Sequence, residues 1–157
     1  MPLRAHLDIR PALEADEPFL WDMLYLALFV PPGQPPIPRA VLLQPAISRY
    51  VRDWGRRAGD SGVIAVLNGL PVGAAWLRLF SAADPGYGFV DETTPELTVA
   101  VLPDHRGQGT GTLLLTSLLR TGPSACLSCD PANPAYRLYL RLGFRPLAGS
   151  RTMIWNS

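Results

Sequence analysis

The chain has 157 residues, which fits one domain. Hydrophobic residues make up 48% of it and charged residues 17%, so a globular protein with a buried core is expected and a disordered chain is excluded. A net charge of +1 excludes a broad basic surface for nucleic acid or acidic lipid, and the absence of lysine excludes a Schiff-base lysine and a nucleoside triphosphate P-loop.

The N-terminal third predicts a strand, two helical stretches and a stiff loop. Residues 7–12, LDIRPA, alternate between apolar and polar side chains, as a half-buried strand does. Residues 13–28 have acidic residues in the first turn and apolar residues at helical spacing, which predicts an amphipathic helix. Residues 29–40 hold five prolines and predict a loop, either a lid that shapes a pocket or only a connector. A second, interrupted helical stretch is predicted over 40–57.

The rest of the chain alternates strands and helices. Residues 62–80 contain two apolar stretches around Asn68 and Gly69, which is the turn chemistry of a β-hairpin. A loop at 81–95 precedes a strand at 96–102, a helix at 112–120, a strand at 125–130 and a short helix at 133–143 that Gly143 ends. Terminal strands are predicted at 144–147 and 151–157. This order predicts one domain over residues 1–157, of mixed α/β class, with helices on both faces of a mixed sheet.

The two cysteines, Cys126 and Cys129, are predicted to be buried thiols. No second Cys/His pair could complete a metal site, and in a strand the two side chains would point to opposite faces, so no metal ion is expected. Free thiols suit the reducing cytosol, and the N-terminus MPLRAHLDIRP lacks the apolar core of a signal peptide, so a cytoplasmic location is expected. The longest apolar run is far shorter than the roughly 20 residues of a membrane span, so no membrane association is expected.

The segment RGQGTG, residues 106–111, lies between a predicted strand and a predicted helix. Glycines there let the backbone approach a ligand closely and adopt positive φ. The N–H groups of the turn and of the first helical residues then point at one spot, with the positive end of the helix dipole behind them, which suits a phosphate or diphosphate. A tight turn that binds nothing is the alternative, but one glycine would satisfy it, whereas three glycines and Arg106 are present.

A dinucleotide-binding oxidoreductase is a weaker alternative. Gly107 and Gly109 fit the first half of the pattern Gly-x-Gly-x-x-Gly, and Asp130 ends the next strand at a suitable distance. Thr112 stands where the last glycine belongs. Fewer than fifty residues follow the segment, which is too few for the remaining strand–helix–strand units of that fold.

Two segments resemble the GNAT superfamily of acyl-CoA-dependent N-acetyltransferases. The first is RGQGTG after ELTVAVLPDH, which is similar to the family pattern Arg-x-x-Gly-x-Gly. The second is NPAYRLYLRLGF, residues 133–144, which resembles the family's Asn, short helix with a Tyr, and Gly-Phe. The resemblance covers most of the chain, although the N-terminal third matches only in layout. It implies the GNAT fold, with a mixed, mostly antiparallel sheet, and an enzyme that transfers acetyl from acetyl-CoA to a primary amine.

The same resemblance implies how acetyl-CoA binds. Its pantetheine arm lies along the strand at Val99, Ala100 and Val101, like an added strand. Asn133 caps the short helix and contacts the cofactor, and Tyr136 is either a neighbour of the site or a packing residue. The diphosphate lies on the main-chain N–H groups of Arg106, Gly107, Gln108, Gly109, Thr110, Gly111 and Thr112.

Two residues are expected to move protons. Tyr139 matches the family's general-acid tyrosine, and a tyrosine anchored at the edge of the core is the alternative. Glu96 opens the central strand, so it is expected to accept the amine's proton directly or through a water. A solvated charge at a strand end is the alternative for Glu96, and Asp91 and Glu92 are rival acids.

The acceptor is left open among small amines, amino acids, antibiotics and protein N-termini. Trp21, Tyr25 and Tyr87 are candidates for substrate binding, although aromatic residues can also simply fill the core. His105, beside the expected phosphate site, is a weak candidate for a base, and His6 is weaker still. A CoA-binding sensor without turnover is the alternative to an enzyme, and a homodimer is left open.

Overall fold

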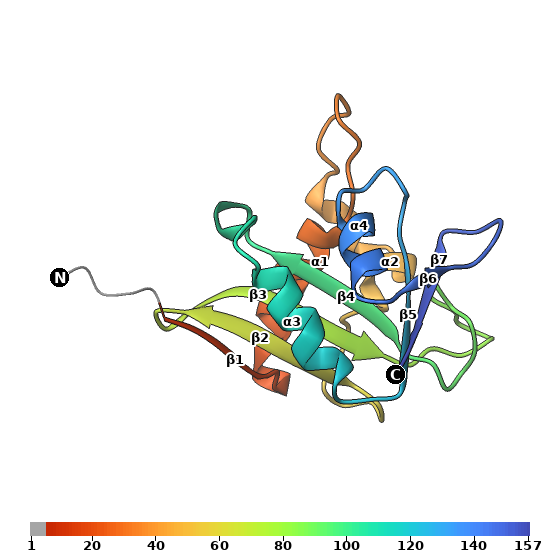
Figure 1. Ribbon diagram of the computed structural model, residues 1–157, viewed down its shortest axis with the longest axis horizontal. Helices are drawn as coiled ribbons and strands as arrows, with labels where there is room; N and C mark the ends of the chain where they lie inside the picture. Colours follow the sequence, from red (N-terminus) through yellow and green to blue (C-terminus); the bar gives the residue numbers. More distant parts are fainter. Residues whose placement is uncertain (1–5) are drawn as a thin grey trace.

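The computed structural model describes residues 6–157. Residues 1–5, the first part of the N-terminal segment in which no signal peptide is expected, lie outside the described residues. Its centre is a seven-stranded sheet in the order β1-β2-β3-β4-β5-β7-β6 (Figure 1). All neighbouring strands are antiparallel except β4 and β5, which confirms the predicted mixed, mostly antiparallel sheet. The strands are β1 Leu7–Pro11, β2 Ser61–Leu67, β3 Leu70–Arg78, β4 Glu96–Val101, β5 Ser124–Ser128, β6 Arg145–Pro146 and β7 Thr152–Asn156.

The predicted order of helices and strands is confirmed, and the largest difference lies in the second helical stretch. In place of a helix over 40–57, the chain forms a short 3₁₀ helix, a single helical turn and then irregular turns. Pro45 has no N–H to continue the first helix, and Asp53 and Gly55 have φ angles of 56° and 96°, which no α-helix contains. The helices are α1 Glu17–Ala27, α2 Pro45–Ser48, α3 Thr110–Leu119 and α4 Ala135–Arg141, with 3₁₀ turns η1 Glu14–Asp16, η2 Arg39–Leu43 and η3 Pro103–His105.

Helices cover both faces of the sheet, as predicted. In Figure 1, α3 lies in front of the strands and α1 lies behind them. Leu114 and Leu118 of α3 pack with Tyr139 of α4 in the core of the front face, while Leu20 of α1 packs with Trp76 of β3 in the core behind the sheet. No helix within residues 6–157 is long and apolar enough to cross a membrane.

The hairpin between β2 and β3 forms at the predicted turn. Asn68 and Gly69 have φ angles of 50° and 84°, which is the left-handed pair that a two-residue hairpin turn requires. Its strands lead to a buried ion pair: Arg78, at the end of β3, contacts Asp60 through two hydrogen bonds of 3.0 and 2.9 Å. The same guanidinium donates to the carbonyls of Arg49 and Arg52, so it ties β3 to the turns after α2.

The strands β4 and β5 pair only at the start of β4. Their ladder contains one residue pair, Glu96 with Cys126, and the N–H of Cys126 donates to the carbonyl of Pro95 at 2.9 Å. Beyond that point the two strands run apart, which Figure 1 shows clearly. Within the part of the chain that the structure describes, the C-terminal half of β4 therefore has a strand on one side only.

Candidate functional site

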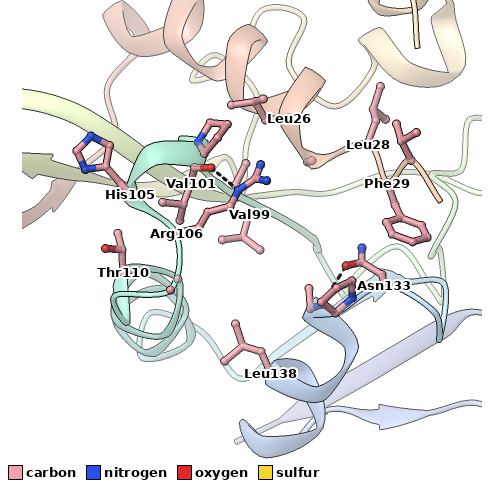
Figure 2. Close-up of a pocket in the computed structure, with 18 of the residues that line it drawn as sticks. Leu26, Leu28, Phe29, Val99, Val101, His105, Arg106, Thr110, Asn133 and Leu138 are labelled. Carbon is pink, nitrogen blue, oxygen red and sulfur yellow. Dashed lines mark hydrogen bonds between the residues drawn. The ribbon is translucent and has the colours of Figure 1, made fainter. Parts of the chain in front are cut away.

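A cavity of about 1000 Å³ lies beside the open half of β4 (Figure 2). Its lining comes from the end of α1 with the loop that follows, from β4, from the glycine turn with the start of α3, and from Asn133 with the start of α4. A cavity of this volume stands at the upper end of the usual range for ligand pockets, so it is large enough for a cofactor.

The open edge of β4 exposes main-chain hydrogen-bonding groups to this cavity. In a strand, the N–H and C=O groups of successive residues point to opposite sides. The carbonyl of Pro95 points toward β5. The main-chain groups of Val99 and Val101 therefore point to the same side of β4, where no strand of the described residues faces them. The carbonyl of Val101 accepts the Nε–H of Arg106 at 3.1 Å, which ties the glycine turn to the end of the strand (Figure 2). Among residues 6–157, no group forms a hydrogen bond with the N–H or C=O of Val99 or with the N–H of Val101.

The glycine turn presents a row of free N–H groups. Gly107 and Gly109 have φ angles of 75° and 82°, and a Cβ at either position would meet no protein atom within 4 Å. Within the described residues, no N–H from 107 to 112 donates to another protein group. The helix, predicted from Thr112, begins at Thr110, because left-handed Gly109 caps it. The N–H groups of its first turn, which have no partner inside the helix, therefore lie at the cavity.

The start of α4 forms the opposite wall. The N-cap residue of α4 is Pro134 rather than the predicted Asn133, although the side-chain oxygen of Asn133 accepts the N–H of Ala135, the first residue of the helix, at 3.0 Å (Figure 2). Tyr139 lines the cavity and is 8% exposed, and its ring packs edge-on against Phe144. Burial, and then the neighbouring Cys129, raise the pKa of Tyr139, so its hydroxyl keeps its proton at neutral pH. No described residue forms a hydrogen bond with that hydroxyl.

Glu96 is buried and does not line the cavity. One carboxylate oxygen accepts the hydroxyl of Tyr50 at 2.7 Å, and the other accepts the N–H of Gly88 at 3.1 Å. A Cβ at Gly86 would collide with this carboxylate, so the segment 85–88 can cover it only because residue 86 is a glycine. Burial raises the pKa of Glu96, while the bonds from Tyr50 and Gly88 oppose that rise.

Asp91, Glu92 and the two histidines are less suitably placed than Glu96 to act as the base. Asp91 and Glu92 are exposed, and hydrogen bonds from Thr94 and then Thr93 hold the pKa of Asp91 below its usual range. His105 lines the cavity at the glycine turn, far along β4 from Glu96. His6 is exposed beside Asp8 at the N-terminus.

The predicted acceptor and cofactor residues divide into two groups. Tyr25 lines the cavity, and its hydroxyl donates to the carbonyl of Ile37. Trp21 donates to Glu17 and lies outside the lining, and exposed Tyr87 stacks on Tyr50 outside it as well. The other predicted cofactor residues all line the cavity, apart from Gln108 and Tyr136.

Several lining residues were not predicted. Leu138 and Arg141 come from α4, where helical spacing around Tyr139 could have identified them. Residues 26–30 and Ile37 form a wall after α1; an apolar run next to a proline-rich loop carries no signal that separates a pocket wall from core. The loop is therefore part of the pocket rather than only a connector.

The cysteines match the prediction of buried, unpaired thiols. Burial raises the pKa of Cys126 to about 12 and that of Cys129 to about 11, so both remain protonated at neutral pH. Within residues 6–157, no group of three or more His, Cys, Asp and Glu side chains could hold a metal ion.

Several solved structures share this fold. The ribosomal-protein-alanine N-acetyltransferase from Brucella melitensis is 22% identical, with a TM-score of 0.62 over 96% of this chain and 99% of that one. The PaiA N-acetyltransferase from Thermoplasma acidophilum, in complex with coenzyme A, is 12% identical, with a TM-score of 0.64 over 97% and 99%. A GNAT family acetyltransferase from Brucella melitensis, in complex with acetyl-CoA, is 18% identical, with a TM-score of 0.59 over 96% and 88%.

The sequence itself also carries a family match. No curated protein matches the chain. The model of the acetyltransferase (GNAT) family, however, matches residues 22–144, which include the cavity lining from Tyr25 to Arg141. The predicted resemblance is confirmed: the chain belongs to the acetyltransferase (GNAT) family.

Proposed function

We propose that the protein transfers an acetyl group from acetyl-CoA to a primary amine. One observation carries the proposal: the free N–H groups of residues 107–112 stand at the end of an unpaired strand edge, within one cavity. The turn suits a diphosphate, because backbone donors and the positive end of α3 point at the same place. The neighbours solved with CoA or acetyl-CoA support the same ligand.

The chain's own groups suit the rest of the cofactor. The N–H and C=O of Val99 and the N–H of Val101 would bind the amide groups of the pantetheine arm as an added strand binds a sheet edge. Arg106 would face the diphosphate with the guanidinium nitrogens that Val101 does not use. Asn133 lies across the cavity and would contact the arm from the other wall.

Bound acetyl-CoA would supply a thioester, whose carbonyl carbon forms a bond to the amine nitrogen while its bond to sulfur breaks. Tyr139 would give its hydroxyl proton to the departing sulfur, which its place in the cavity wall supports. Glu96 would take the proton that the amine loses. Because its carboxylate is covered, we assign that transfer to an intervening water rather than to direct contact. Glu96 then releases its proton to solvent, and Tyr139 regains one.

The test separates binding from turnover. Calorimetry with acetyl-CoA should give a saturable heat, and acetyl-CoA should be consumed only when a primary amine is added. Binding without consumption by any amine would support the alternative of a CoA-binding sensor. No binding by a folded protein would overturn the proposal. A cytoplasmic location is also proposed, and the two unpaired buried thiols support it.

A further inference from the structure

The two ends of the cavity differ in chemistry. At one end lie His105, Arg106 and Thr110, around the glycine turn (Figure 2). Leu28 and Phe29 lie at the other end, on the side of Asn133. If the turn holds the diphosphate, as the proposed function has it, the thioester and the incoming amine meet at the end with Leu28 and Phe29.

The wall at this end is apolar and only half-buried. Residues 26–30 are all half-buried. Leu26 and Leu28 also pack against the core behind the sheet, but Phe29 contacts neither hydrophobic core cluster while it lines the cavity. A phenylalanine that faces a cavity gains free energy when an apolar group replaces the water on its ring. Phe29 therefore marks a place for an apolar group.

The lining offers no carboxylate to a second positive charge. Among the described residues that line the cavity, none is an aspartate or a glutamate, and the charged side chains are Arg106 and Arg141. The nearest acid on α1, Asp22, is paired with Arg39. An amine with several ammonium groups would lose water there without gaining a carboxylate partner, which is unfavourable.

The apolar wall is also built in advance. The Tyr25 hydroxyl donates to the carbonyl of Ile37, so the two ends of the loop are joined. Arg39 lies over the Tyr25 ring, 5.5 Å from its centre. In between, Pro31 accepts the N–H of Gln34 at 3.1 Å across a tight turn that left-handed Gly33 permits. A wall held in this way binds a ligand without a further loss of loop entropy.

We propose that the acceptor is a primary amine that carries one apolar aliphatic or aromatic group and no second cationic group, with Phe29 as the residue that selects it. The amine nitrogen forms the new bond to the acetyl carbon, and the apolar group lies on the ring of Phe29. This inference rests on the proposed function, because the position of the reacting end follows from the diphosphate site.

Steady-state kinetics with acetyl-CoA and four amines tests the inference: 2-phenylethylamine, hexylamine, spermidine and glycinamide. The value of kcat/KM should be at least about tenfold higher for the first two amines, as burial of an apolar group of that size predicts. Phe29→Ala should lower kcat/KM for 2-phenylethylamine by about tenfold. The kcat/KM for glycinamide and the Kd of acetyl-CoA should stay unchanged. Phe29→Leu should recover most of the lost kcat/KM for 2-phenylethylamine. Leu43→Ala, at an exposed position of η2 outside the lining, is the matched control.

The contrary results are distinct. A preference for spermidine, or an equal loss for every amine in Phe29→Ala, would overturn the inference and leave acetyl transfer intact. The inference would also be overturned if kcat/KM rose with the length of the acyl chain, from acetyl-CoA to hexanoyl-CoA, and did not depend on the amine. The apolar wall would then hold the acyl chain. Failure to bind acetyl-CoA at all would instead remove the proposed function, and this inference with it.

Discussion

The hydroxyl of Tyr50 donates a 2.7 Å hydrogen bond to the carboxylate of Glu96, although 46 residues separate them in the chain. The same hydroxyl accepts the N–H of Tyr87, and the segment 85–88 closes over the pair. A carboxylate in this setting is desolvated, which favours its neutral form, and Tyr50 is the strongest single group that favours the ionised form. Tyr50 therefore helps to keep Glu96 able to accept a proton.

Tyr50→Phe should move the acidic limb of the kcat/KM profile to higher pH. Glu96 must be ionised to act, and the loss of the donor raises its pKa further above the usual value. One hydrogen bond to a charged group corresponds to a shift of about one pH unit. The pH dependence of kcat/KM, measured with a saturating excess of acetyl-CoA, checks this.

Tyr87→Phe is the control for that experiment, because the Tyr87 group in the network is its main-chain N–H, which the substitution keeps. Its profile should match that of the wild type. A titration of the Glu96 carboxyl carbon by NMR gives the same shift without any need for activity. If the acidic limb of the kcat/KM profile did not move in Tyr50→Phe, ionisation of Glu96 would not be what determines that limb.

Gly109→Ala should weaken acetyl-CoA binding by about tenfold or more, because a methyl group enters the space where the turn faces its ligand and the positive φ is strained. Gly69→Ala is matched in conformation: its φ is 84° and its Cβ would also meet no protein atom within 4 Å. Calorimetry should show a higher Kd for acetyl-CoA in Gly109→Ala alone. Both variants should lose a similar, small amount of stability. Equal Kd values would remove the turn from the binding site.

Tyr139→Phe should lower kcat by about 100-fold, the lower end of the usual range for a general acid, with the Kd of acetyl-CoA unchanged. The ring keeps its contact with Phe144, so the fold is preserved. Tyr136→Phe, one helical turn earlier and outside the cavity lining, should keep the wild-type kcat. If both variants turn over at the wild-type rate, Tyr139 is a packing residue only.

Asp60→Ala should lower the free energy of unfolding by about 3–5 kcal/mol, because it leaves the Arg78 guanidinium buried without its carboxylate. Urea unfolding at neutral pH measures the change. Arg56→Ala removes two contacts of 4.0 Å between exposed side chains, with Glu14 and with Asp53, and should change stability by less than about 0.5 kcal/mol. A similar loss in both variants would contradict a specific role for the buried pair.

Short-range chemistry explains which features of the fold and site the amino-acid sequence predicts. The hairpin turn at Asn68 and Gly69 follows from two residues that tolerate positive φ, and the glycine turn follows from the same property. Tyr139 can be predicted as a cavity residue because a short signature surrounds it, and the order of elements follows from local hydrophobic spacing. The predicted start of α3 is two residues late because Gly109 acts as a left-handed cap, which spacing alone does not reveal.

The tertiary structure alone decided how distant segments meet. The divergence of β4 and β5, the covering of Glu96 by Tyr50 and the segment 85–88, and the apolar wall around Phe29 all join residues far apart in the chain. Their local sequences are compatible with core, loop or site, because burial depends on what packs against a side chain rather than on its neighbours in sequence. The amino-acid sequence thus determined most of the elements and the glycine turn, and the packing of the sheet determined which acid is covered and which aromatic ring and which wall line the cavity.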